Sequence, residues 1–375
     1  MSDPSPSLDA PAYVESLLAR AALAGASDIH VEPIAHGTEI RFRIDGVLEP
    51  VEKLPMDVGR SVALRLMVMA QLLTYRLEIP QEGRIHWETP APAGDATRAP
   101  GTPPTLDLRL AIMPVAHGIR AVVRMPAELS QPRTLQDLGL PPACLAALEA
   151  FARADAGMLL VTGPAGSGKT TTIYALLEHI ARASPGTSII ALEDPIERLV
   201  TGITQIEVTP QGQLTYERAL KSILRQDPQV LMLGEVRDAP TASIAVQAAL
   251  SGHRLIATMH AGEPATAVTR LLEMGVEPYQ VTSSIYGILT QRLVRRLHTP
   301  AAINRPAAYK GRIPLAEFGL LTDPARAAIL ARADSGTLRK IFDTQPGHAT
   351  LYTVADGLVA AGVTDSAEIR RVLGD

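Results

Sequence analysis

Residues 163–171 read Gly163-Pro164-Ala165-Gly166-Ser167-Gly168-Lys169-Thr170-Thr171, which matches the phosphate-binding pattern G-x-x-x-x-G-K-[ST] in full. An apolar run from Met158 to Val161 precedes this stretch, and apolar residues at helical spacing follow it. A strand, a glycine-rich loop and a helix bind phosphate together, because the loop N–H groups and the helix N-terminus face the anion. We expect Lys169 to reach the β- and γ-phosphates of ATP and the Thr170 hydroxyl to ligate Mg²⁺.

The composition is that of a folded protein with few cysteines. The chain has 375 residues, of which 46% are hydrophobic, enough for the cores of about two domains. It contains no apolar run of roughly 18 residues and no N-terminal signal peptide. Cys144 is the only cysteine, which excludes an intramolecular disulfide and a cysteine-rich zinc site, so we expect a cytoplasmic protein without zinc. A net charge of -4 and an aromatic content of 3% disfavour nucleic-acid binding.

The pattern along the chain predicts two domains. Residues 1–10 are rich in Pro and Ser and predict a flexible tail, and residues 11–125 predict a small α+β domain. Five prolines and two glycines indicate that residues 89–105 form a mobile loop within this domain. A short linker at residues 126–133 leads to the nucleotide-binding domain, residues 134–375.

The second domain alternates apolar strands with helices. This alternation predicts a parallel sheet covered on both faces. The strands are expected at residues 158–162, 188–193, 229–233 and 254–259. From about residue 278 the pattern predicts a mostly helical region, in which Gln291–Arg296 would form the solvated face of a helix.

Polar side chains follow three of these strands. Glu193 ends the second strand and is a candidate catalytic acid. Glu235 follows the third strand, where it would polarise a water that attacks the γ-phosphate. Gly234 stands where a Mg²⁺-binding aspartate is usual. His260 follows the fourth strand and would sense the γ-phosphate or the water. The carboxyl ends of parallel strands share the ligand-binding edge of such a sheet. Each of these side chains could instead be purely structural.

Taken together, these blocks resemble the secretion ATPases of type II secretion and type IV pilus systems, from about residue 26 to the C-terminus. Glu193–Glu197 resembles the aspartate box of that family, Leu224–Asp238 its Walker B block and Gly252–His260 its histidine box. Pro80–Ile85 is similar to a signature of the family's N-terminal domain.

The resemblance implies a RecA-like P-loop ATPase domain, a smaller PAS-like α+β domain before it and a helical C-terminal region. It implies a homo-hexamer that hydrolyses ATP to power pilus or pseudopilus assembly or disassembly, or type II protein secretion. Such a ring works at the cytoplasmic face of an inner-membrane platform protein and associates with the membrane through its partners. Arginines of the N-terminal domain complete the ATP site in this family, and Arg84 and Arg109 are the matching positions, with Arg124 as a further candidate. The four-cysteine zinc loop that many members carry is absent.

Two other functions remain open at this point. The first is a ring translocase that acts on nucleic acid, against which the acidic balance and the scarcity of aromatic residues weigh. The second is a regulator that binds ATP without hydrolysing it. The presence of Lys169, Thr170, Glu193 and Glu235 weighs against that second reading.

Overall fold

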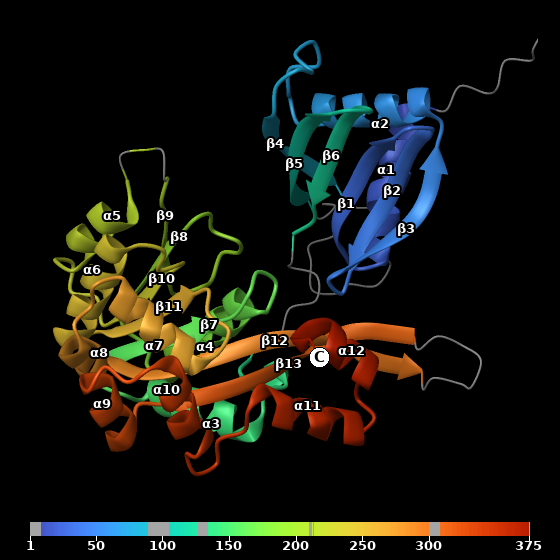
Figure 1. Cartoon of the computed structure of the whole chain (residues 1–375). Helices are drawn as coiled ribbons and strands as arrows, with labels where there is room; N and C mark the ends of the chain where they lie inside the picture. Colours follow the sequence, from blue (N-terminus) through green and yellow to red (C-terminus); the bar gives the residue numbers. More distant parts are fainter. Residues whose placement is uncertain are drawn as a thin grey trace, which may run out of the picture. The chain divides into compact units, whose positions relative to one another are not determined.

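The computed structural model describes residues 9–88, 105–126, 134–209, 212, 214–299 and 308–374. The chain divides into two compact units, Met1–Gln131 and Pro132–Asp375, and each has a hydrophobic core of its own (Figure 1). The expected tail, mobile loop and linker lie almost entirely outside the described residues. No helix in the described part of the chain is long and apolar enough to span a membrane.

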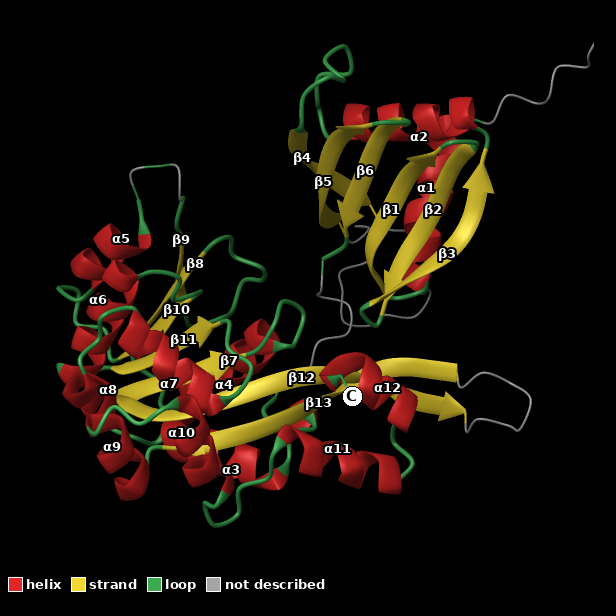
Figure 2. Ribbon diagram, viewed as in Figure 1, coloured by secondary structure: helices red, strands yellow, loops and turns green. Residues whose placement is uncertain are grey.

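The first unit is one antiparallel sheet with two helices packed on one face (Figure 2). The strand order is β3-β2-β1-β6-β5-β4. Alternate residues of each strand enter the core, as the sequence of β5 predicts: Leu108 and Leu110 are buried, whereas Arg109 between them is exposed. The elements of this unit are α1 (Ala10–Leu23), β1 (Ala26–Ile34), β2 (Gly37–Ile44), β3 (Val47–Leu54), α2 (Met56–Met69), β4 (Gln81–Glu88), β5 (Thr105–Val115) and β6 (Gly118–Arg124).

The second unit is built on a seven-stranded sheet in the order β13-β12-β7-β11-β10-β8-β9. All neighbouring strands pair in parallel except β12 and β13, which are antiparallel. Its first elements are α3 (Pro142–Ala152), β7 (Gly157–Thr162), α4 (Lys169–Ala183), β8 (Ile189–Glu193), β9 (Thr204–Glu207), α5 (Tyr216–Ile223), β10 (Val230–Leu233), α6 (Ala239–Leu250), β11 (Arg254–Met259) and α7 (Pro264–Glu273). They are followed by α8 (Pro278–Ser284), β12 (Ile285–Thr299), β13 (Ala308–Leu320), α9 (Asp323–Leu330), α10 (Ser335–Asp343), α11 (Leu351–Ala360) and α12 (Ser366–Leu373).

Helices cover both faces of this second sheet, as predicted. Successive residues of β7 therefore enter different cores: Met158 and Leu160 pack with the α6 and α7 side, and Leu159 and Val161 with the α3 and α4 side. A strand buried on both faces reads as an unbroken apolar run, which is why the sequence pattern located it. The four predicted strands are confirmed as β7, β8, β10 and β11.

The prediction for residues beyond 278 is wrong in part. Residues 285–299 and 308–320 form the long strands β12 and β13, and the C-terminal run of helices begins only at Asp323. Gln291–Arg296 therefore lies on a strand and not on a helix. The spacing of apolar residues in this segment also fits a helix, but the edge of β7 offers it a ladder of backbone hydrogen bonds. Tertiary pairing overrides the local pattern here.

A buried ion pair ties the last helix to β12. The Glu368 side chain of α12 is fully buried and accepts hydrogen bonds from the Arg295 backbone N–H at 2.9 Å, from Arg295 Nη2 at 2.7 Å and from Arg371 Nε at 2.7 Å. Burial would raise the pKa of Glu368, but the hydrogen bonds from Arg371 and Arg295 outweigh it and lower the pKa to about 2.

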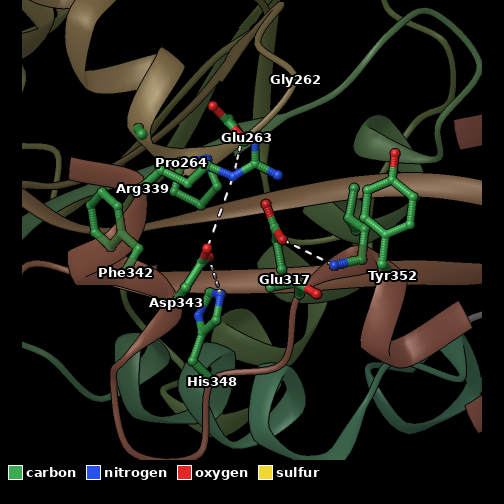
Figure 3. A pocket seen from close by; sticks show the side chains of 12 residues that line it. Gly262, Glu263, Pro264, Glu317, Arg339, Phe342, Asp343, His348 and Tyr352 are labelled. Atoms are coloured by element: carbon green, nitrogen blue, oxygen red, sulfur yellow. Dashed lines mark hydrogen bonds and ion pairs between the residues drawn. The ribbon is translucent and has the colours of Figure 1, made fainter. Parts of the chain in front are cut away.

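The C-terminal helices also line a pocket of about 70 Å³ against β13 and the start of α7 (Figure 3). Arg339 Nε lies 3.3 Å from Glu263 Oε2 and 3.9 Å from Asp343 Oδ2. Glu317 points into the same pocket, and its only hydrogen bond among the described residues comes from the Leu351 backbone N–H at 3.0 Å. Burial raises the pKa of Glu317 to about 7.

We predict that Glu368→Gln lowers the free energy of unfolding by about 3 kcal/mol at pH 7, because it leaves the largely buried Arg295 side chain without its carboxylate. The folded pKa of Glu368 lies below its ordinary value of 4.5, so this stabilisation is complete above about pH 5 and is lost as the pH falls towards 2. Urea denaturation at pH 7 measures the difference. Asp356→Asn, on the exposed face of α11, is the control and should change stability little. Equal stability of the two variants would contradict the prediction.

Glu317→Gln should have the opposite pH dependence. The folded pKa of about 7 lies above the ordinary value of 4.5, so the wild-type carboxyl is tolerated below about pH 4.5 and destabilises the fold as the pH rises through 7. The glutamine variant keeps an acceptor for the Leu351 N–H and has no charge to bury. At pH 8 it should exceed the wild type in stability by on the order of 3 kcal/mol, and the difference should shrink as the pH falls and vanish below about pH 4.5. Paired denaturation curves that stay parallel across this range would refute it.

Candidate functional site

The phosphate-binding loop lies between β7 and α4, as the sequence predicts. Gly163 has a φ of 144°, and a Cβ there would collide with the carbonyl oxygen of Gln291, so the loop can start only with glycine. Gly168, with a φ of 91°, makes the turn into α4. Lys169 begins this helix, and its Nζ donates to the carbonyl oxygens of Gly163 and Pro164, both at 2.9 Å.

The rest of the loop is divided between exposed backbone and buried side chains. Pro164, Ala165 and Gly166 form the exposed crest, and Thr170 and Thr171 are partly exposed on the first turn of α4. Ser167 is buried, and its hydroxyl has no hydrogen-bond partner among the described residues. The crest therefore leaves the backbone of the loop accessible, which a phosphate site requires.

Glu235 and His260 meet beside this loop. β11 pairs in parallel with β7, and β10 pairs in parallel with β11, which brings the carboxyl ends of all three strands to the same edge of the sheet. Glu235 Oε1 lies 3.1 Å from His260 Nε2, and His260 Nδ1 lies 3.2 Å from the Gly163 carbonyl oxygen. Arg237 Nε donates to the other oxygen of Glu235 at 2.6 Å. A continuous chain of polar contacts therefore joins the acid, the histidine and the loop.

The strand before Glu235 has no room for a further acid. Gly234 follows β10 directly, and a Cβ at this position would lie 2.5 Å from Tyr216 Oη and 3.2 Å from the Leu192 carbonyl oxygen. An aspartate in this place would displace the tyrosine. Glu235, whose side chain is 15% exposed, is thus the acid that this strand presents at the site.

Glu193 has a different environment at the end of β8. The residue is 3% exposed, one of its oxygens accepts from the Tyr174 hydroxyl of α4, and the other accepts from Gln205 Nε2 at 2.8 Å. Burial raises the pKa of Glu193, and these two hydrogen bonds act against that rise. Both oxygens are thus occupied, and the carboxylate fastens β8 to α4 behind the loop.

Three arginines of the first unit lie side by side on its sheet. Arg84 of β4 is opposite Arg109 of β5, and Arg109 is opposite Arg124 of β6, so all three point to the exposed face away from the helices. Arg124 Nε also lies 3.2 Å from Asp28 Oδ1. The structure thus gathers the predicted arginine positions into one row, and their role at the ATP site stays a prediction.

Sequence reasoning missed one part of the site. Gln291, expected on a solvated face, is 1% exposed, and its Nε2 donates to Thr172 Oγ1 on α4 at 3.0 Å. Arg292 follows it and lies against the Gly262 carbonyl oxygen, two residues past His260. A signal was available: the three polar residues Thr290, Gln291 and Arg292 directly follow the run 285–289 and repeat the pattern of the other strand ends.

The chain matches the family model described as "Type II/IV secretion system protein" over residues 9–371. It is 39% identical to Type II secretion system protein HxcR of Pseudomonas aeruginosa, over 96% of this chain and 77% of that protein. It is 37% identical to Type II secretion system protein E of Xanthomonas campestris pv. campestris, over 93% and 65% respectively. It is 35% identical to the Type IV pilus assembly ATPase PilB of Thermus thermophilus, over 95% and 42%. The chain thus spans less than two thirds of the second and third of these relatives.

Two solved structures share the fold. The ATPase DotB of Yersinia pseudotuberculosis superposes with a TM-score of 0.76 at 21% identity, over 99% of this chain and 95% of that one. The pilus retraction motor PilT with bound ADP gives 0.64 at 22% identity, over 95% and 96%. These likenesses confirm the predicted RecA-like ATPase fold with a smaller N-terminal domain. The match of the family model to nearly the whole chain, and the relatives at 35% identity and above, show that this chain belongs to the Type II/IV secretion system protein family, as the resemblance predicted.

Proposed function

We propose that this chain is the motor ATPase of a type II secretion or type IV pilus machine. It hydrolyses ATP, and the energy powers protein secretion or the assembly and disassembly of a pilus. The observation that carries the proposal is the meeting of the ends of β7, β10 and β11 at the phosphate-binding loop. The Gly163 carbonyl oxygen contacts both Lys169 and His260, and Glu235 contacts the other nitrogen of that histidine. The names of the relatives, which are type II secretion proteins and a pilus assembly ATPase, support it.

The chemistry follows from what each side chain can donate or accept. Loop N–H groups and Lys169 would bind the phosphates and stabilise negative charge as the γ-phosphoryl group is transferred. Glu235 would orient the attacking water through its carboxylate, which Arg237 and His260 hold in place. His260 bridges Glu235 and the loop carbonyl, so its position would follow any movement of the loop on nucleotide binding.

The residues at the loop fit a magnesium ion. Mg²⁺ takes few protein ligands beside phosphate and water oxygens, and it prefers hard oxygen donors. The Thr170 hydroxyl, next to Lys169 on the first turn of α4, is such a donor and would hold the ion. Bound there with ATP, Mg²⁺ would neutralise charge on the β- and γ-phosphates.

The working unit would be a homo-hexameric ring. The row formed by Arg84, Arg109 and Arg124 concentrates positive charge on one face of the first unit, where it could stabilise the charge of a transferring phosphoryl group. The ring would act at the cytoplasmic face of the inner membrane, bound to a platform protein of the secretion or pilus machine. No nucleic-acid substrate is proposed.

We predict that one variant loses both ATP binding and hydrolysis, whereas another loses hydrolysis alone. Lys169→Ala should weaken ATP binding and hydrolysis together, because it removes the cation nearest the phosphates. Glu235→Gln should bind ATP but turn it over at least about 10²-fold more slowly. Titration calorimetry with ATP and a phosphate-release assay measure the two effects. Glu273→Gln, at the exposed end of α7, is the control. Unchanged turnover in Glu235→Gln would remove Glu235 from the role, and hydrolysis by Lys169→Ala at the wild-type rate would contradict the whole site.

A second prediction concerns the ring. Arg84→Ala and Arg109→Ala should retain ATP binding and lose turnover, by as much as about 10³-fold if they act as arginine fingers. Arg60→Ala, on the exposed side of α2, should behave as the wild type. Activity per chain should rise with protein concentration as rings assemble, which light scattering can follow in parallel. Full activity of a monomer would refute the ring requirement, and wild-type turnover in both arginine variants would refute their assignment alone.

A further inference from the structure

Strand β12 forms a second wall of the phosphate-binding loop. It pairs in parallel with β7, with Thr290 opposite Thr162, and the hydroxyl oxygens of these two residues lie 2.8 Å apart. The next residue, Gln291, contributes the carbonyl oxygen that leaves no space for a Cβ on Gly163. The residues of β12 that directly follow Thr290 therefore lie beside the loop.

The backbone of β12 is fixed at this point. The Gln291 amide is buried and donates to Thr172 Oγ1 on α4, the helix that begins with Lys169. The same side chain thus connects the strand to the helix that carries the loop lysine. Because the strand cannot slide along the loop, the side chain of Arg292 leaves the backbone from a fixed position.

Arg292 has an unusual set of partners for a half-buried arginine. Its guanidinium donates to two backbone carbonyl oxygens, that of Gln291 at 3.0 Å and that of Gly262 at 3.4 Å. In the described ranges of the chain, no carboxylate forms an ion pair with it. Burial lowers the pKa of Arg292, and the more distant Glu317 acts in the opposite direction. Buried arginines are ordinarily paired with an anion. The positive charge of Arg292 is therefore available to a bound anion.

Lys169 likewise has hydrogen bonds to carbonyl oxygens and no ion pair with a carboxylate among the described residues. Its ammonium group also donates only to carbonyl oxygens, those of Gly163 and Pro164. Burial lowers the pKa of Lys169, the charge of Glu235 opposes this, and the charge of Arg292 lowers it further. The two cations are thus close enough to repel each other, and neither is neutralised by direct contact with a carboxylate. Such a pair beside the exposed crest of the phosphate-binding loop favours an anion of high charge.

We propose that Arg292 is a phosphate-binding residue of the nucleotide site, a second fixed cation beside Lys169. This inference rests on the proposed ATPase function and adds a residue to its site. The contact with Gly262 places Arg292 next to the segment that carries His260, on the side where Glu235 would hold the attacking water. Arg292 therefore contacts the terminal phosphate, and it favours ATP over ADP. A planar guanidinium suits this task because two of its N–H groups can bind two phosphate oxygens.

The test compares a variant that removes the positive charge of residue 292 with a variant that keeps it. Arg292→Gln keeps an amide that can donate to the two carbonyls but has no charge, and Arg292→Lys keeps the charge. In calorimetric titrations of the full chain with Mg-ATP and Mg-ADP at equal ionic strength, Arg292→Gln should weaken ATP binding about ten- to hundredfold and ADP binding less. Arg292→Lys should lie closer to the wild type. Arg296→Ala, an exposed arginine on the same strand, is the matched control and should bind as the wild type does.

The outcomes are distinct. Wild-type ATP affinity in Arg292→Gln would overturn the inference, because the side chain would then only support Gly262; the proposed ATPase would stand as long as the wild-type chain hydrolyses ATP. An equal loss for ATP and ADP, or the same loss in Arg296→Ala, would also overturn it. If Arg292→Gln does not fold, Arg292→Met supplies an uncharged side chain of similar length for the same comparison. No ATP binding by the wild-type chain would overturn the inference and the proposed function together.

Discussion

The carbonyl oxygen of Gly163 is the point on which the site depends. It accepts from Lys169 Nζ at 2.9 Å and lies 3.2 Å from His260 Nδ1, so one backbone atom connects the loop lysine with the end of β11. The geometry holds only because residue 163 has no side chain: its φ of 144° and the adjacent carbonyl of Gln291 both exclude a Cβ. Glu235 joins this arrangement through the histidine, since β10 and β11 are adjacent in parallel register. A shift of the loop would therefore move its lysine and histidine contacts together.

Glu193 and Glu235, the two acids at the strand ends, have different surroundings. Glu193 is enclosed, with both oxygens bonded to Tyr174 and Gln205, and burial raises its pKa. Glu235 instead contacts two nitrogen-bearing side chains, those of Arg237 and His260. A carboxylate fixed in this way can orient a water molecule, whereas one that binds a tyrosine hydroxyl serves better to hold a helix against a strand. These contacts support the proposed role of Glu235.

The C-terminal third of the chain supports this edge of the sheet from outside. β12 lies against the loop, β13 pairs with β12, and α12 is fastened to β12 by the buried Glu368. On the other side, the segment after His260 reaches Arg339 of α10 through Glu263. The nucleotide loop and the C-terminal helices are thus connected by two routes, each through charged side chains at short distance. Such connections are suited to pass a change at the nucleotide to the rest of the unit.

The sequence by itself determined the loop, the four central strands and the acids and histidine at their ends. These features are local: a glycine pattern between a strand and a helix, and apolar runs that end in a polar residue, carry their meaning within about ten residues. Only the tertiary structure decided that residues 285–299 are a strand, and with it the place of Gln291 and Arg292 beside the loop. The reason is physical: the periodicity of this segment fits two conformations. The choice is made by backbone hydrogen bonds to β7, a segment more than a hundred residues away, and the periodicity alone does not contain that pairing.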